Sequence, residues 1–81
     1  MKFLFHTLIM YEVVAVYYNI YSKEQHYLAE VLSNPSQLQD ATNFELYNDN
    51  GEWHSSISLP TRCLDIVGEE IDNYNRSRKP M

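Results

Sequence analysis

The chain begins with a long apolar run that neither glycine nor proline interrupts. Residues 1–22 read MKFLFHTLIMYEVVAVYYNIYS, and their content of Phe, Tyr, Val and Ile favours strands over helices. One strand over 3–21 would span roughly 60 Å at about 3.3 Å per residue, which is too long for a small domain. We therefore predict strands over 2–9 and 13–21, joined by a turn or bulge at 10–12. A buried helix in part of the run is the alternative, because a continuous apolar run has no diagnostic period.

The next segment has the pattern of a short amphipathic helix. Residues 22–25 (SKEQ) have the form of a capping box, which predicts a helix start. Four apolar residues follow at helical spacing: Tyr27, Leu28, Val31 and Leu32. Asn34-Pro35 ends the pattern, because a residue before proline disfavours the helical conformation. With Asn34 as its cap, Pro35 also suits the first position of a further short helical turn, ending at Gln39 or Ala41.

A β-hairpin is predicted over 44–59. Residues 44–47 and 53–59 flank the sequence NDNG at 48–51, whose residues tolerate the positive φ of a tight turn. In the second arm, alternate residues are expected on the buried face: Trp53, Ser55, Ile57 and Leu59. The residues between them are expected to face solvent, so that one face is buried and the other is solvated. Pro60 is expected to end this arm.

The last part of the chain predicts an amphipathic helix with Thr61 as its N-cap. On a wheel of 100° per residue, the arc expected to face the core holds Cys63, Leu64, Val67, Ile71 and Tyr74. The opposite arc holds the carboxylates Asp65, Glu69 and Asp72. Gly68 lies near this acidic arc. We interpret it as tolerated helix strain of about 1 kcal/mol, and the alternative is a place where a partner approaches closely.

These elements predict an α+β fold. The expected architecture is a small two-layer sandwich, with an antiparallel sheet of about four strands and two helices on one face, in the order ββαββα. A length of 81 residues allows one core. We place a single globular domain at 1–75 and a basic C-terminal tail at 76–81. Such a sandwich leaves one sheet face uncovered.

Charge is distributed unevenly along the chain. Residues 1–75 carry eleven acidic and three basic side chains, a net charge of −8, whereas the tail adds Arg76, Arg78 and Lys79. An acidic body repels nucleic-acid phosphates and attracts basic surfaces. The seven tyrosines and Trp53 exceed what a small core holds with every hydroxyl paired. Some are therefore expected at the surface, where Tyr and Trp favour protein interfaces.

The sequence offers no motif for catalysis, metal binding or phosphate binding. Candidate metal ligands are scattered one to an element, without the spacing of a zinc site: His6, His26, His54 and Cys63. Cys63 lies on the core arc, where a thiol is inert. The two glycines do not form a phosphate-binding loop. We therefore expect no cofactor, no metal and no enzyme activity.

The location of the protein follows from its cysteine and its first segment. A single cysteine is typical of a reducing compartment, so that we expect a cytoplasmic protein. Residues 3–21 are apolar enough to suggest a membrane span, but Glu12 would lie near mid-bilayer at a cost of about 2.5 kcal/mol or more. No small-residue cleavage site follows the run. Membrane association is therefore not expected.

Together these features indicate a non-enzymatic, acidic protein-binding module. Its partner would be a larger protein with a basic surface that handles nucleic acid, inhibited or modulated because the module occupies the phosphate positions. The expected contact residues are Asp65, Glu69, Glu70 and Asp72 of the last helix and Tyr47, Asp49, Glu52 and Trp53 of the hairpin. In size, charge and lack of motifs the chain is similar to the small anti-defence inhibitors made by phages, anti-CRISPR proteins among them. This likeness assigns no site residues.

Two alternative functions follow from the uncovered sheet face. Together with the basic tail, this face could bind nucleic acid directly, although the acidic body disfavours it. The same face, or an edge strand of the first hairpin, could instead pair with a second copy across a two-fold axis and form a homodimer.

Overall fold

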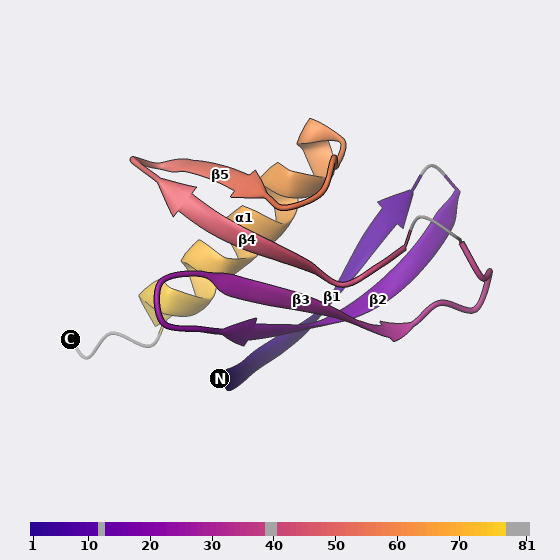
Figure 1. Ribbon diagram of the computed structural model, residues 1–81, viewed down its shortest axis with the longest axis horizontal. Coiled ribbons are helices and arrows are strands. Elements are labelled where there is room, and N and C mark those ends of the chain that lie inside the picture. Colours follow the sequence, from indigo (N-terminus) through magenta and orange to yellow (C-terminus); the bar gives the residue numbers. More distant parts are fainter. Residues whose placement is uncertain (12, 39–40, 78–81) are drawn as a thin grey trace.

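A five-stranded sheet and one helix make up the fold (Figure 1). The computed structural model describes residues 1–11, 13–38 and 41–77. The elements are β1 (Lys2–Tyr11), β2 (Val14–Ser22), β3 (Tyr27–Ser33), β4 (Phe44–Asp49), β5 (Glu52–Ser55) and α1 (Thr61–Ser77). The strands form one antiparallel sheet in the order β1-β2-β3-β4-β5, so that each strand pairs with its neighbour in the sequence.

The predicted order ββαββα with two helices is wrong, because the order in the described part of the chain is βββββα. The segment predicted as the first helix is the strand β3. Its residues also fit a period of two: Ala29 is buried, and Tyr27 and Val31 pack against the core. β3 lies between β2 and β4, and its backbone amide and carbonyl groups form hydrogen bonds with both strands. This pairing outweighs the local helical pattern, which is a weak preference over seven residues.

The predicted capping box and the short helical turn are also absent from the described residues. Ser22 is the last residue of β2, and the Lys23 amide donates to the His26 carbonyl at 2.7 Å in the turn that leads to β3. After β3, the Gln37 amide donates to the Asn34 carbonyl, and Gln37 has a positive φ of 53°. Asn34 therefore organises a tight turn instead of a helix. The predicted end at Gln39 lies outside the described residues.

Both predicted hairpins are confirmed. β1 and β2 pair up to Tyr11 opposite Val14. β1 extends two residues beyond its predicted end, whereas β2 starts one residue after its predicted start. In the second hairpin Asp49 pairs with Glu52. The two residues between them, Asn50 and Gly51, have φ of 54° and 91°, the signs that a type I′ turn requires. β5 ends at Ser55, four residues before the predicted end.

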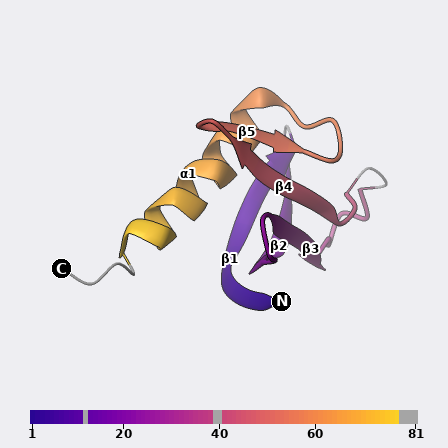
Figure 2. The same ribbon diagram turned by 60° about the vertical axis from the view of Figure 1, so that its left-hand side comes forward.

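The sheet curls into a half-barrel, and α1 lies on its inner face (Figure 2). The helix contacts β1 and β5, the two edge strands. Alternate residues of the strands point inward and meet the helix in one core: Ile9, Val16, Tyr18, Ile20, Ala29, Phe44, Leu46, Cys63, Val67 and Ile71. The rings of Tyr18 and Phe44 meet edge to face at 5.4 Å near its centre.

The predicted core arc of the last helix is confirmed for four of its five residues, whereas Tyr74 is half-buried with its ring centroid 5.6 Å from that of Phe5. Cys63, Val67 and Ile71 are buried, and Leu64 packs beside them. The Leu64 amide donates to the Pro60 carbonyl at 3.2 Å, so that Pro60 holds the N-cap position and Thr61 is the first helical residue. The helix therefore starts one residue earlier than predicted.

Candidate interaction surfaces

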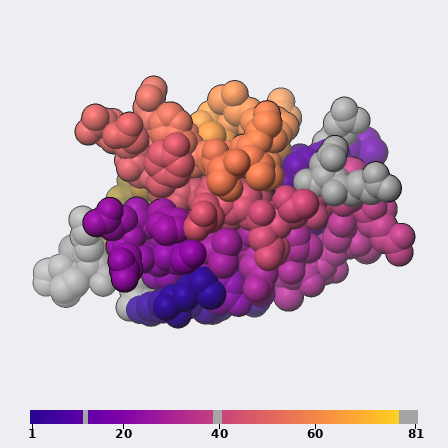
Figure 3. All heavy atoms as spheres, in the orientation of Figure 1, coloured from indigo at the N-terminus to yellow at the C-terminus, as the bar shows by residue number. Residues whose placement is uncertain are grey.

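The carboxylates of the second half of the chain lie on two elements that pack together. Residues 49–72 contain six acidic residues and one basic residue, Arg62. Four of the six are exposed and form what we call the acidic surface: Asp49 and Glu52 on the β4–β5 hairpin, and Asp65 and Glu69 on α1. Figure 3 shows this hairpin and the start of α1 side by side above strands β2 and β3.

The other two predicted carboxylates are half-buried and bind within the chain. Glu70 Oε1 accepts a hydrogen bond of 2.7 Å from the hydroxyl of Thr7, the one polar side chain found buried among the described residues. Asp72 Oδ2 accepts a hydrogen bond of 3.3 Å from Trp53 Nε1. Glu70 and Asp72 thus connect α1 to the two edge strands of the sheet. One carboxylate oxygen of each residue already accepts a hydrogen bond from within the chain.

The two predicted aromatic contact residues differ in their surroundings. The Trp53 indole lies against Gly68 of α1 so closely that a Cβ atom on Gly68 would overlap it. Trp53 is half-buried and also contacts the Tyr27 ring at 5.6 Å. Tyr47 is exposed on the other side of the sheet and stacks on His54 at 5.2 Å. Of the two, only Tyr47 offers a broad face to a partner.

The close approach at Gly68 comes from the chain itself. Neither tolerated strain nor room for a partner, the two interpretations drawn from the sequence, describes this position. The glycine is buried under Trp53, and this contact fixes β5 on the helix. It also fixes the two parts of the acidic surface relative to each other.

The predicted basic tail begins inside the helix. Arg76 lies in the last turn of α1, where its Nη2 donates to Asn73 Oδ1 at 2.8 Å and its Nε to the Asp72 carbonyl. A guanidinium at a helix C-terminus complements the helix dipole. Arg78 and Lys79 lie outside the described residues. The described part of the tail therefore stabilises the helix end.

The outer sheet face carries an apolar surface that the sequence pattern did not reveal. Leu8 of β1 pairs with Tyr17 of β2, and Met10 pairs with Ala15. Leu8, Met10 and Tyr17 are exposed, whereas Thr7 and Ile9, which alternate with Leu8 and Met10 along β1, point inward. Because both parities of this strand are largely apolar, alternation could not identify the buried face. Only the position of α1 decides it.

A polar row crosses the same outer face. His6 and Asn19 pair across β1 and β2, and His6 Nδ1 lies 2.6 Å from Asn19 Oδ1. Glu30 is the next residue along the row, and its Oε1 accepts a hydrogen bond of 3.2 Å from the Tyr21 hydroxyl. The polar groups of this row therefore satisfy one another within the chain, and the row separates the apolar hairpin end from Phe3 and Tyr21.

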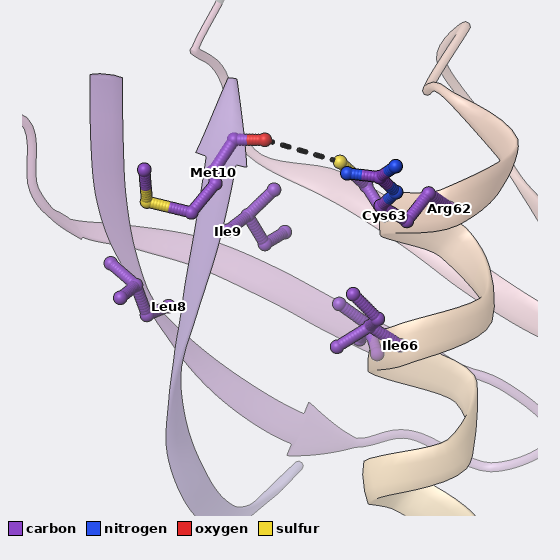
Figure 4. Close-up of a pocket in the computed structure, with 7 residues that line it drawn as sticks. Leu8, Ile9, Met10, Arg62, Cys63 and Ile66 are labelled. Carbon is purple, nitrogen blue, oxygen red and sulfur yellow. Dashed lines mark hydrogen bonds between the residues drawn. The ribbon is translucent and has the colours of Figure 1, made fainter. Parts of the chain in front are cut away.

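A cleft opens between the edge strand β1 and the helix (Figure 4). It has a volume of about 150 Å³ and is lined by Leu8, Ile9, Met10, Arg62, Cys63, Ile66 and Val67. The Cys63 thiol donates to the Met10 carbonyl at 3.4 Å and closes one end. Ile66 points from α1 toward β1, and its side chain is exposed. The cleft is mainly apolar, with one guanidinium at its rim.

Among the described residues, Glu45 and the pair Tyr11 and Tyr18 are titratable groups whose surroundings shift their pKa. Glu45 accepts hydrogen bonds from His26 Nε2 at 2.6 Å and Lys23 Nζ at 3.3 Å, and these neighbours hold the pKa of its carboxyl below the ordinary 4.5. In the core, the hydroxyls of Tyr11 and Tyr18 lie 2.8 Å apart. Burial, above all, raises the pKa of Tyr18 and that of Tyr11 above the ordinary 10.0.

The described residues contain no group of three or more His, Cys, Asp or Glu side chains placed to hold a metal ion. Within the same ranges, no helix has the length and apolar character needed to cross a membrane. Comparisons with models of protein families, with curated proteins and with solved structures found no match. The surfaces of the chain are therefore the features from which its function is inferred.

Proposed function

We propose that this protein is a non-enzymatic binding module whose acidic surface occupies a basic surface of a larger, nucleic-acid-handling protein. The observation that carries the proposal is the concentration of six carboxylates and one basic residue within residues 49–72. The two elements that hold them are fixed together by Trp53 on Gly68. A rigid array of carboxylates resembles a row of phosphates in charge, so that it competes with nucleic acid for the same Lys and Arg side chains.

The predicted contact residues take two roles in this proposal. Asp49, Glu52, Asp65 and Glu69 are exposed and make the contacts with the partner. Glu70, Asp72 and Trp53 hold the helix and the hairpin in place. Ordering the array before binding lowers the conformational entropy cost of association.

We place this activity in the cytoplasm. The chain has a single cysteine, and Cys63 is buried with its thiol bonded to a backbone carbonyl. A protein that depends on no disulfide suits a reducing compartment.

The test is capture of a basic partner from a lysate at low salt, followed by binding measurements with the purified partner. Glu69→Lys should weaken binding at least tenfold, because it replaces a negative charge of the acidic surface with a positive one. Glu30→Lys is the matched control, since it changes the net charge equally on the opposite side of the sheet. Equal binding by wild type and Glu69→Lys, or equal weakening by both variants, would contradict the proposal.

A further inference from the structure

An open groove lies on the outer face of the sheet, between β4 and the turn that joins β2 to β3. It has a volume of about 490 Å³, and its walls include Gln25 and His26 of the turn and Glu45, Tyr47 and Asp49 of β4. The β2–β3 turn and the β4–β5 turn lie at the same end of the sheet (Figure 1). All the residues that line the groove are polar or aromatic. The groove therefore suits a polar ligand.

The alternation of β4 places an aromatic ring between two carboxylates. Phe44 and Leu46 are buried on the inner face of the sheet. Glu45, Tyr47 and Asp49 consequently share the outer face, in a row about 13 Å long at about 3.3 Å per residue. Tyr47 stands in the middle of this row.

The Tyr47 ring is supported on one side and open on the other. His54 of β5 pairs with Tyr47 and stacks on its ring, with 5.2 Å between the ring centroids and 21° between the planes. The groove lies on the opposite side of β4, because β3 pairs there and His26, the residue before β3, lines the groove. Tyr47 is 45% exposed. The imidazole thus holds the ring and leaves its groove side accessible.

Both carboxylates beside the ring can accept further hydrogen bonds. Glu45 Oε1 already accepts from His26 and Lys23, which hold the carboxylate in place. Within the described ranges, neither Glu45 Oε2 nor the Asp49 carboxylate has a hydrogen bond or ion pair. Free carboxylate oxygens on either side of an aromatic face attract a cation.

The arrangement discriminates between possible ligands. A nucleobase stacked on Tyr47 would bring its phosphates close to Asp49, and charge repulsion disfavours this. A lysine ammonium is a compact and strongly hydrated charge. An arginine guanidinium is planar, stacks on aromatic rings and directs donors in its plane toward carboxylates. The groove therefore matches arginine best.

From these observations we propose that the groove binds an arginine side chain of the partner. Its guanidinium stacks on Tyr47 and donates to Asp49 and to the free oxygen of Glu45. This inference rests on the proposed function and deepens it, because it names the basic group that the partner presents. It also gives Tyr47, which carries no charge, a specific role in recognition.

The test is isothermal titration calorimetry of the chain at low salt with two peptides of equal length and charge, hexa-arginine and hexa-lysine. The wild type should bind hexa-arginine about threefold more tightly, the size of an exposed cation–π contact. Tyr47→Ala should lose this preference, whereas Tyr47→Phe keeps the ring and should retain it. Tyr17→Ala is the matched control, because it removes an exposed tyrosine of β2 outside the groove and should retain the preference.

The possible outcomes separate this inference from the proposed function. Equal affinity of the wild type for both peptides would overturn the arginine site. So would a preference that survives in Tyr47→Ala, or one that Tyr17→Ala also removes. Glu69→Lys should weaken the binding of both peptides and leave their ratio unchanged, because it alters charge without touching the ring. If neither peptide binds the wild type, the proposed function is contradicted as well. Circular dichroism checks that each variant is folded, as expected for substitutions of exposed side chains.

Discussion

At the scale of single residues, Gly68 is a position where the helix backbone lies directly against a side chain, the Trp53 indole. The helix accepts a glycine here, at a cost of about 1 kcal/mol relative to alanine, because any larger residue would overlap the Trp53 indole. The packing of Trp53 of β5 against α1 compensates for the helix stability that the glycine lacks.

We predict that Gly68→Ala destabilises the protein by about 1–3 kcal/mol, even though alanine favours the helix, because the added methyl group overpacks a filled position. The measurement is urea unfolding followed by circular dichroism. The same substitution in a Trp53→Leu background provides the control, since the smaller side chain leaves room for the methyl group. There the substitution should cost less than in the wild type. If Gly68→Ala lowered the free energy of unfolding equally in both backgrounds, overlap with Trp53 would not be the cause of the destabilisation.

The pair formed by Tyr11 and Tyr18 is the second feature at this scale. Tyr18 is fully buried, and its hydroxyl is bonded to that of Tyr11. Burial raises the pKa of both groups. The native state therefore keeps protons that the unfolded chain releases above pH 10, the ordinary pKa of tyrosine.

The titration of these two tyrosines should consequently leave stability unchanged with pH below pH 10 and lower it as the pH rises above 10. The expected slope is at most about 1.4 kcal/mol per pH unit for each group. Tyr18→Phe removes one of the two groups, so that stability should fall less steeply with pH. At neutral pH the same variant should lose about 1 kcal/mol, because the Tyr11 hydroxyl loses its partner. Urea unfolding at a series of pH values measures both effects, and an unchanged slope would contradict this assignment.

At the scale of elements, α1 is attached to both edges of the half-barrel. Glu70 binds Thr7 of β1, and Asp72 binds Trp53 of β5. Asn75 also donates to the Tyr27 hydroxyl of β3 at 3.1 Å. An open curved sheet has two unpaired edges. A helix that binds both of them holds the curvature and supplies the inner half of the core.

Two adjacent glutamates of the helix allow a matched test of this arrangement. Glu70→Ala should destabilise the protein by about 1–3 kcal/mol, because it leaves the buried Thr7 hydroxyl without its partner. Glu69→Ala, one residue earlier and exposed, should change stability by less than about 0.5 kcal/mol. Thermal unfolding compares the two variants. Equal effects would show that the hydrogen bond to Thr7 does not anchor the helix.

At the scale of the whole molecule, two surfaces of different chemistry lie on different elements. The acidic surface is charged and belongs to the β4–β5 hairpin and α1. The exposed residues Leu8, Met10 and Tyr17 on the outer sheet face are apolar and belong to β1 and β2.

Binding through the acidic surface should depend on salt. Partner binding should weaken as ionic strength rises, because salt screens exposed charges. Titrations of the purified partner between low and high salt test this. Partner binding that is insensitive to salt would contradict a role for the carboxylates.

Elements with local signals could be predicted from the amino-acid sequence alone. The Asn-Gly pair at 50–51 requires a tight turn, since these residues accept the positive φ of a two-residue hairpin loop. The apolar arc of the last helix follows from its period of 3.6 residues, and Cys63, Val67 and Ile71 are buried as that period predicts. The acidic character of residues 49–72 is a matter of composition. Each of these depends only on neighbouring residues.

Only the tertiary structure decided the rest. Residues 27–33 fit a helix and a strand equally well, and pairing with both β2 and β4 makes them a strand. In β1 both parities are largely apolar, so that the packing of α1 alone determines that Ile9 is buried and that Leu8 and Met10 are exposed. The contact of Trp53 with Gly68 joins residues 15 positions apart in the chain. Local patterns do not contain such information, because these choices depend on partners that folding brings together.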